Sequence, residues 1–146
     1  MMAVEYKSIV PWGRSYDEYI KMFNLSEKDL NKKILGCGDG PAAFNAQLTR
    51  RNGKVVSIDP IYQYSKEQIL ERINETFDVV MEQTKNNFDR FVWNNIKNIE
   101  ELGKIRMEAM KEFISDYEIG KTEKRYIYGE LPIMPNLNIK FDIALS

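Results

Sequence analysis

The sequence contains no histidine, which removes several kinds of catalytic chemistry at once. Ser-His and Cys-His nucleophile pairs, imidazole metal sites and histidine general bases are all excluded. A single cysteine, Cys37, allows no disulfide within the chain, in keeping with a reducing cytoplasm. The formal net charge of −1 provides no general attraction to nucleic acid.

Long hydrophobic runs are also missing. No apolar stretch approaches the roughly 20 residues needed to cross a bilayer. The first seven residues include an acidic side chain and lack the long apolar core of a signal peptide. With 146 residues, of which 43% are hydrophobic and 29% charged, we expect one cytoplasmic domain over residues 1–146 that has no membrane partner.

The most informative stretch is a glycine-rich turn that follows an apolar segment. Gly36, Gly38 and Gly40 form G-x-G-x-G, which suits a backbone that turns sharply and lies close to a ligand. Pro41 is suited to the first position of a helix, which we predict over residues 41–50. Asp59 ends the next predicted strand, 54–58, nineteen residues after Gly40. A carboxylate at that distance is placed to accept hydrogen bonds from ribose hydroxyls, so the pattern indicates a nucleoside site.

Two other interpretations of this turn stay open. A nicotinamide dinucleotide fingerprint, G-x-G-x-x-G/A, places Pro41 at its third small position when it begins at Gly36, and Pro41 fits poorly. When the fingerprint begins at Gly38, that position is Ala43, which moves the turn deeper into the helix. The simplest alternative is a tight connection between strand and helix that binds nothing.

Four segments, taken together, resemble class I S-adenosylmethionine-dependent methyltransferases. Residues 36–40 resemble the first motif of that family, and residues 57–60 resemble the acidic end of its second strand. Residues 125–132 resemble its third strand with the acidic turn beyond, and residues 141–146 resemble its fourth strand. The resemblance covers residues 30–62 and 125–146 well and the middle of the chain poorly.

This resemblance implies an α/β fold with a Rossmann-like, mostly parallel sheet flanked by helices. Strands in the order 3-2-1-4 are expected, with a long helical insertion between strands two and three. The implied activity is methyl transfer with S-adenosylmethionine as cofactor and an acceptor that the sequence does not identify. No catalytic residue and no metal ligand is assigned. The cofactor-binding residues implied by the motifs are Gly36, Cys37, Gly38, Gly40, Asp59, Pro60, Glu130 and Leu131.

Glu130 resembles the acidic residue that receives the adenine amino group, and Leu131 its neighbour at the ring edge. The chain departs from the family at Ile34, where an acidic residue is usual. It also ends after the fourth strand, whereas family members continue through three more. We therefore expect an open edge at residues 141–145, with two alternatives: another chain completes the sheet, or the 146 residues are a fragment of a longer product. A binding or assembly module without catalysis remains the alternative.

Helices are predicted on both sides of the first two strands. Capping boxes formed by Ser15 with Glu18 and by Ser26 with Asp29 each predict a helix start. Residues 65–120 form the helical insertion, which Gly120 is expected to end. Its apolar stripes and an aromatic patch at 88–96 either pack on the sheet or form a lid, a substrate wall or a dimer face.

Three aromatic residues and one arginine are further candidates for the cofactor site. Trp12 and Arg14 precede the first strand, where such segments often close over the cofactor in the resembled family; ordinary packing is the alternative. Tyr62 and Tyr64 follow Asp59 and could line the adenine side.

Overall fold

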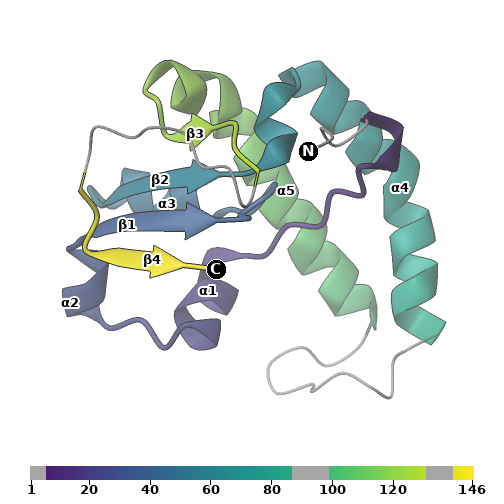
Figure 1. The fold of residues 1–146 in the computed structure, drawn as a ribbon. Coiled ribbons are helices and arrows are strands. Elements are labelled where there is room, and N and C mark those ends of the chain that lie inside the picture. Colours follow the sequence, from purple (N-terminus) through teal and green to yellow (C-terminus); the bar gives the residue numbers. More distant parts are fainter. Residues whose placement is uncertain (1–5, 87–98, 131–139) are drawn as a thin grey trace.

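The structure, a computed structural model, describes residues 6–86, 99–130 and 140–146. Its centre is a four-stranded parallel sheet in the order β3-β2-β1-β4 (Figure 1). This order confirms the predicted fold class. The strands are β1 (Lys33–Cys37), β2 (Lys54–Ile58), β3 (Tyr126–Ile127) and β4 (Ile143–Leu145).

Two short helices precede the sheet, and both begin as predicted. In α1 (Tyr16–Met22) the Ser15 hydroxyl accepts from the Glu18 backbone N–H, and the Glu18 carboxylate accepts from the Ser15 N–H. The same reciprocal pair forms between Ser26 and Asp29 at the start of α2 (Glu27–Leu30). Both capping boxes satisfy backbone donors that the first helical turn leaves free.

The helix between β1 and β2 begins later than predicted. Helix α3 spans Phe44–Arg50, so the prediction that Pro41 opens it is wrong. The backbone N–H of Ala43 donates to the Arg14 carbonyl, which ties the end of the glycine turn to the preceding segment. The turn therefore extends through Pro41 before the helix starts.

The insertion between β2 and β3 is a pair of long helices, α4 (Lys66–Asn86) and α5 (Ile99–Thr122), after a short 3-10 turn η2 (Pro60–Gln63). The predicted capping box of Ser65 with Gln68 is present at the start of α4. Gly120 does not end α5, which continues to Thr122. Gly120 instead leaves room for the Tyr126 ring, because a Cβ at this position would lie 2.2 Å from that ring. The aromatic patch at 88–96 lies outside the described residues.

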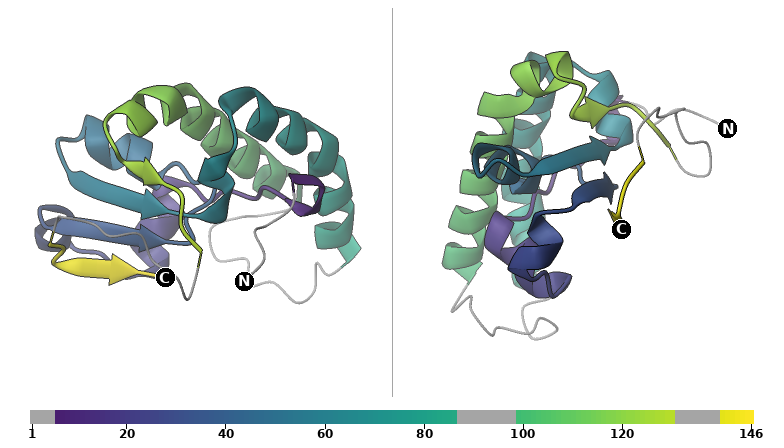
Figure 2. Two further views of the ribbon diagram at one scale, coloured as in Figure 1. Left: turned by 45° about the horizontal axis from the view of Figure 1, so that its top comes forward. Right: turned by 90° about the vertical axis from the view of Figure 1, so that its left-hand side faces the viewer.

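Helices α1, α3 and α5 lie on one side of the sheet, and α4 packs on α5 (Figure 2). The apolar stripes of α4 and α5 pack into the core with residues from η2 and β3, and the members of that cluster are Ile9, Ile61, Tyr62, Ile69, Ile73, Met110, Phe113, Ile114, Tyr117 and Tyr126. A second cluster joins α1, α3 and the sheet, and its members are Tyr16, Tyr19, Ile34, Ala42, Phe44, Leu48, Val55 and Leu145. Among the described residues, no helix has the length and apolar character needed to cross a membrane.

Candidate functional site

The glycine turn joins the carboxyl end of β1 to α3, and its glycines have different roles. Gly38 and Gly40 have φ values of 73° and 54°, in the left-handed region that favours glycine. A Cβ on Gly38 would meet nothing within 4 Å, so the outer surface of the turn is open. A Cβ on Gly36 would lie 2.0 Å from an Asp39 carboxylate oxygen, so Gly36 makes room for that buried side chain.

Asp39, in the middle of the turn, points into the protein. Its Oδ1 accepts from the Tyr19 hydroxyl at 2.8 Å, and its Oδ2 accepts from the Ser57 hydroxyl at 2.5 Å. Burial raises the pKa of Asp39, and Asp59 adds to the rise, while the two hydroxyl donors oppose it. Asp39 thus anchors the turn to α1 and β2 from within. The sequence patterns did not single out this carboxyl group.

A chain of polar side chains continues from Asp39 across the sheet. The Asn45 amide donates to the Ser57 hydroxyl oxygen at 3.0 Å, and its carbonyl accepts from Arg125 Nη1 at 2.6 Å. Arg125 also forms a two-point ion pair with Asp116 of α5, both contacts being 2.8 Å. The glycine turn is therefore linked by hydrogen bonds to Arg125, which directly precedes β3, and through it to α5.

Asp59 lies at the carboxyl end of β2 and faces the glycine turn. Its Oδ2 accepts from the Gly40 N–H at 2.9 Å, and its Oδ1 accepts from the Ile61 N–H at 2.8 Å. Burial raises the pKa of Asp59, and these two backbone donors oppose the rise. A carboxylate offers about four acceptor positions. After the two backbone bonds, Asp59 keeps acceptor capacity for hydroxyl groups of a ligand.

A cavity of about 420 Å³ opens where the turn and Asp59 meet. Such a position, at the carboxyl ends of parallel strands, is where α/β sheets commonly bind ligands. Four of the residues predicted for cofactor binding line it, namely Gly38, Gly40, Asp59 and Pro60. The remaining lining residues are Ser8, Ile9, Val10, Pro11, Trp12, Asp39, Pro41 and Ile61.

The predicted residues Gly36 and Cys37 belong to β1 and do not line this cavity. Burial raises the pKa of the Cys37 thiol, which leaves it protonated rather than reactive. Glu130 accepts a hydrogen bond from the Tyr128 hydroxyl at 2.8 Å and does not line the cavity either. Leu131 lies outside the described residues.

Of the four further candidates for the cofactor site, one lines the cavity and three do not. Trp12 lines the cavity, whereas Arg14 extends toward Glu18, with 3.7 Å between the charged groups. Tyr62 does not line this cavity, since the residue is 1% exposed within the core and its hydroxyl donates to the Gly40 carbonyl. Tyr64 is absent from the described lining as well, and its ring lies 5.4 Å from that of Tyr6.

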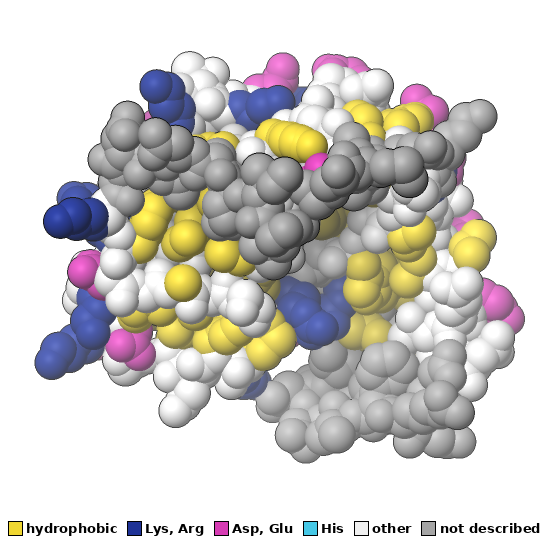
Figure 3. All heavy atoms as spheres, in the orientation of Figure 1, with side chains coloured by type: hydrophobic (Ala, Val, Ile, Leu, Met, Phe, Trp, Pro, Cys, Tyr) yellow, Lys and Arg dark blue, Asp and Glu magenta, His cyan; other side chains and the backbone are white. Residues whose placement is uncertain are grey.

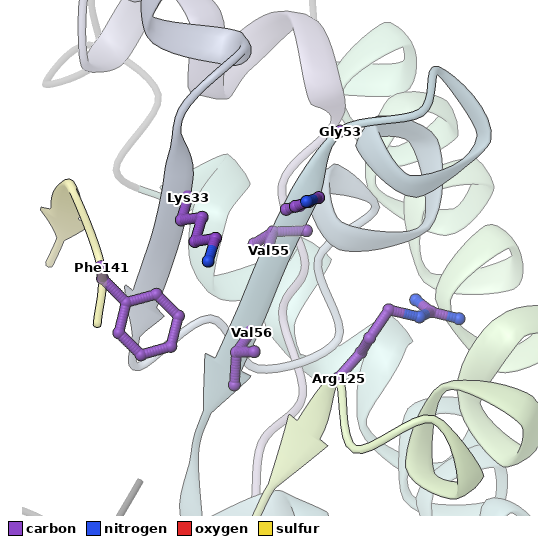
Figure 4. Close-up of a pocket in the computed structure, with 7 residues that line it drawn as sticks. Lys33, Gly53, Val55, Val56, Arg125 and Phe141 are labelled. Atoms are coloured by element: carbon purple, nitrogen blue, oxygen red, sulfur yellow. The ribbon is translucent and has the colours of Figure 1, made fainter. Parts of the chain in front are cut away.

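A second cavity, of about 340 Å³, lies near the opposite ends of the strands (Figure 4). It is bordered by the residues that open β1 and β2, by Val56, and by Phe141 from the segment before β4. Its walls are mostly apolar and bring together no acid–base pair. We therefore take the cavity at the glycine turn as the candidate site.

Comparison with known proteins identifies one relative among curated proteins. The uncharacterized protein MJ0045 of Methanocaldococcus jannaschii is 34% identical over 146 residues, which cover 99% of this chain. The chain spans 65% of the length of that relative. No protein-family model matches the chain, and no solved structure matches it.

Proposed function

We propose that the chain binds S-adenosylmethionine at the glycine turn and is a methyltransferase or the cofactor-binding part of one. The observation that carries this proposal is the cavity itself, which joins an open glycine turn to Asp59 at the carboxyl ends of β1 and β2. Its volume of about 420 Å³ is within the usual range of small-ligand sites.

The charges around the cavity suit this cofactor. Asp59 is the ionisable side chain that borders the cavity with acceptor capacity to spare, since the Asp39 carboxyl group points into the protein, and the described lining includes no lysine or arginine. S-adenosylmethionine carries a sulfonium and an ammonium group, and a cavity bordered by the Asp59 carboxyl group and, in its described lining, by no cationic side chain favours such cations. The nucleoside hydroxyls would find acceptors in the remaining lone pairs of Asp59.

The same features disfavour a nicotinamide dinucleotide. Binding of a pyrophosphate needs backbone N–H groups that point at the ligand, or nearby cationic side chains. Here the Gly38 N–H donates to the Ile58 carbonyl at 2.8 Å, and the Gly40 N–H donates to Asp59. With these two donors engaged, we rank the oxidoreductase alternative below the methyltransferase.

The chemistry that the cofactor supplies when bound is a methyl group activated by the sulfonium. The residues of this chain would bind and orient it. Gly38 and Gly40 allow close approach to the backbone, Asp59 would hold the ribose, and Trp12 and Pro11 would exclude water from the other side. Proximity and alignment provide a large part of the rate in such a transfer.

The proposal includes a cytoplasmic location, since the chain has a single cysteine and needs no disulfide. We propose no nucleic-acid or membrane partner for the chain. A second copy of the chain, joined through the edge of β4 or through α4 and α5, is the partner that we propose.

Calorimetric titration of the purified chain with S-adenosylmethionine, S-adenosylhomocysteine and NAD tests the proposal. We expect the two adenosyl ligands to bind and NAD not to bind. Asp59→Ala should weaken their binding at least about tenfold, because a hydrogen bond to a charged group is lost. Asp142→Ala, an exposed carboxylate at the start of β4, serves as the matched control and should leave affinity unchanged.

Selective binding of NAD would replace this proposal with the oxidoreductase. Binding of none of the three ligands by folded protein would refute the cofactor site and favour a module that serves assembly. If the adenosyl ligands bind equally well to wild type and Asp59→Ala, the assigned role of Asp59 is wrong.

A further inference from the structure

The outer wall of the candidate cavity is a short N-terminal segment, Ser8–Trp12. It follows the 3-10 turn η1 (Tyr6–Ser8) and runs from α4 toward the carboxyl end of the sheet (Figure 1). The wall is mostly apolar, and Val10 is 56% exposed. The opposite side of the cavity, at Asp59 and the backbone of the glycine turn, is polar. A ligand in the cavity would therefore lie between a polar floor and an apolar wall.

The Arg72 side chain of α4 holds the backbone of this wall at Ile9. Both Nε and Nη2 of Arg72 donate to the Ile9 carbonyl, at 3.1 and 2.7 Å. The Arg72 side chain is only 12% exposed. Two flanking contacts involve neighbouring turns of the same helix, since the Tyr6 hydroxyl donates to the Gln68 carbonyl and the Trp12 ring lies 6.0 Å from Phe77.

We propose that Arg72 is a positioning residue that fixes Ser8–Trp12 as the ligand-contacting wall of the cavity. This inference rests on the proposed adenosyl site and assigns a role to the helical insertion. Arg72 holds the wall at the Ile9 carbonyl, where two N–H groups on one oxygen define its position well. The Arg106 guanidinium of α5 also lies over the Trp12 ring, at 5.7 Å. The neighbouring Val10 and Trp12 then face the cavity, where apolar atoms can contact the uncharged part of the ligand.

The test compares Arg72→Met with Arg72→Lys and with Arg50→Met. Arg50 is an exposed arginine of α3 that pairs with Glu112, so its replacement is a matched control away from the wall. All variants carry Trp93→Phe, which leaves Trp12 as the single tryptophan. The measurements are acrylamide quenching of Trp12 fluorescence without ligand and the affinity for S-adenosylhomocysteine, below the melting temperature of every variant.

We expect Arg72→Met to increase quenching and to weaken binding about tenfold, whereas Arg50→Met changes neither. Arg72→Lys, which keeps one charged donor, should fall between them. If the contact of Arg72 with Ile9 served only stability, Arg72→Met would lower the melting temperature but would not change both Trp12 quenching and ligand affinity.

Unchanged quenching and affinity in Arg72→Met would overturn the inference. Increased quenching with unchanged affinity would show that the wall does not contact ligand, and weaker binding with unchanged quenching would show that Arg72 acts by another route; either result rejects the role. If wild type itself fails to bind, the proposed function fails, while quenching still decides whether Arg72 holds the wall.

Discussion

The buried side chain of Asp39 holds the glycine turn in place. It is 9% exposed, and it holds the glycine turn by accepting hydrogen bonds from Tyr19 and Ser57. Burial disfavours the charged form, so the folded protein holds the proton of Asp39 more tightly than the unfolded chain does. The consequence is a defined dependence of stability on pH.

We predict that Asp39→Asn lowers the free energy of unfolding by about 1–3 kcal/mol at acidic pH, since the amide cannot accept both hydroxyl bonds. Because the pKa of Asp39 is raised, the stability of the wild type falls as pH rises from the ordinary aspartate value of about 4 through the folded-state value. The variant lacks this titration. The stability difference should therefore shrink as pH increases through that window.

Urea denaturation at several pH values measures both curves. Asp59, whose pKa is also raised, is present in both proteins, so it enters the difference only through its interaction with the Asp39 charge. Parallel pH profiles for wild type and variant would contradict the prediction and would mean that Asp39 titrates alike in the folded and unfolded chains.

At the scale of helices and strands, local signals predicted where most elements begin. Ser15, Ser26 and Ser65 each start a helix as expected, because a capping box depends only on residues three positions apart. The bounds of β2, Lys54–Ile58, likewise agree with the strand predicted over residues 54–58. These features are determined by neighbouring residues, so the sequence alone was sufficient for them.

Features that depend on distant residues were not predictable in this way. Pro41 was expected to open a helix, but the Ala43 N–H donates to the Arg14 carbonyl, 29 positions earlier in the chain, and the turn continues. In the candidate site, the glycines and Asp59 followed from a motif, whereas the wall at Ser8–Trp12 depends on Arg72. No local pattern links Ile9 to a residue 63 positions away.

Two glycines within α5 provide a test of packing at the scale of one helix. Gly120→Ala would place a Cβ 2.2 Å from the Tyr126 ring, which is held by core packing and by its bond to Asp116. Gly103→Ala would meet the flexible end of Met81 at 2.8 Å. Both changes gain helix propensity, worth up to about 1 kcal/mol.

We expect Gly120→Ala to lower the free energy of unfolding by about 1–2 kcal/mol, because overpacking outweighs propensity. Gly103→Ala should be neutral or slightly stabilising, since Met81 can move aside. Thermal and urea unfolding of the two variants gives the comparison. Equal effects would show that the Tyr126 ring can shift and that Gly120 is not required for space.

At the scale of the whole molecule, the described helices α1, α3 and α5 cover one face of the sheet, and β4 forms one of its edges. One face is packed against α1, α3 and α5, and hydrophobic side chains gather over the strands on the other (Figures 2 and 3). Parallel sheets are usually covered on both faces. In the described sheet β4 is an outermost strand, and its Ala144 is exposed. About a third of the M. jannaschii relative has no counterpart here, since the match covers 65% of its length.

We predict that the 146-residue chain self-associates through this edge and face, because an unpaired edge of a parallel sheet can pair with another strand. Sedimentation over a range of concentrations should show a species larger than the monomer. Ala144→Lys should shift the equilibrium toward monomer, since a charged side chain beside β4 opposes strand addition. Val79→Lys, at an exposed apolar position of α4, tests the alternative interface through the helices and should have no effect. A monomer at every concentration, or dissociation caused by Val79→Lys alone, would contradict association through β4.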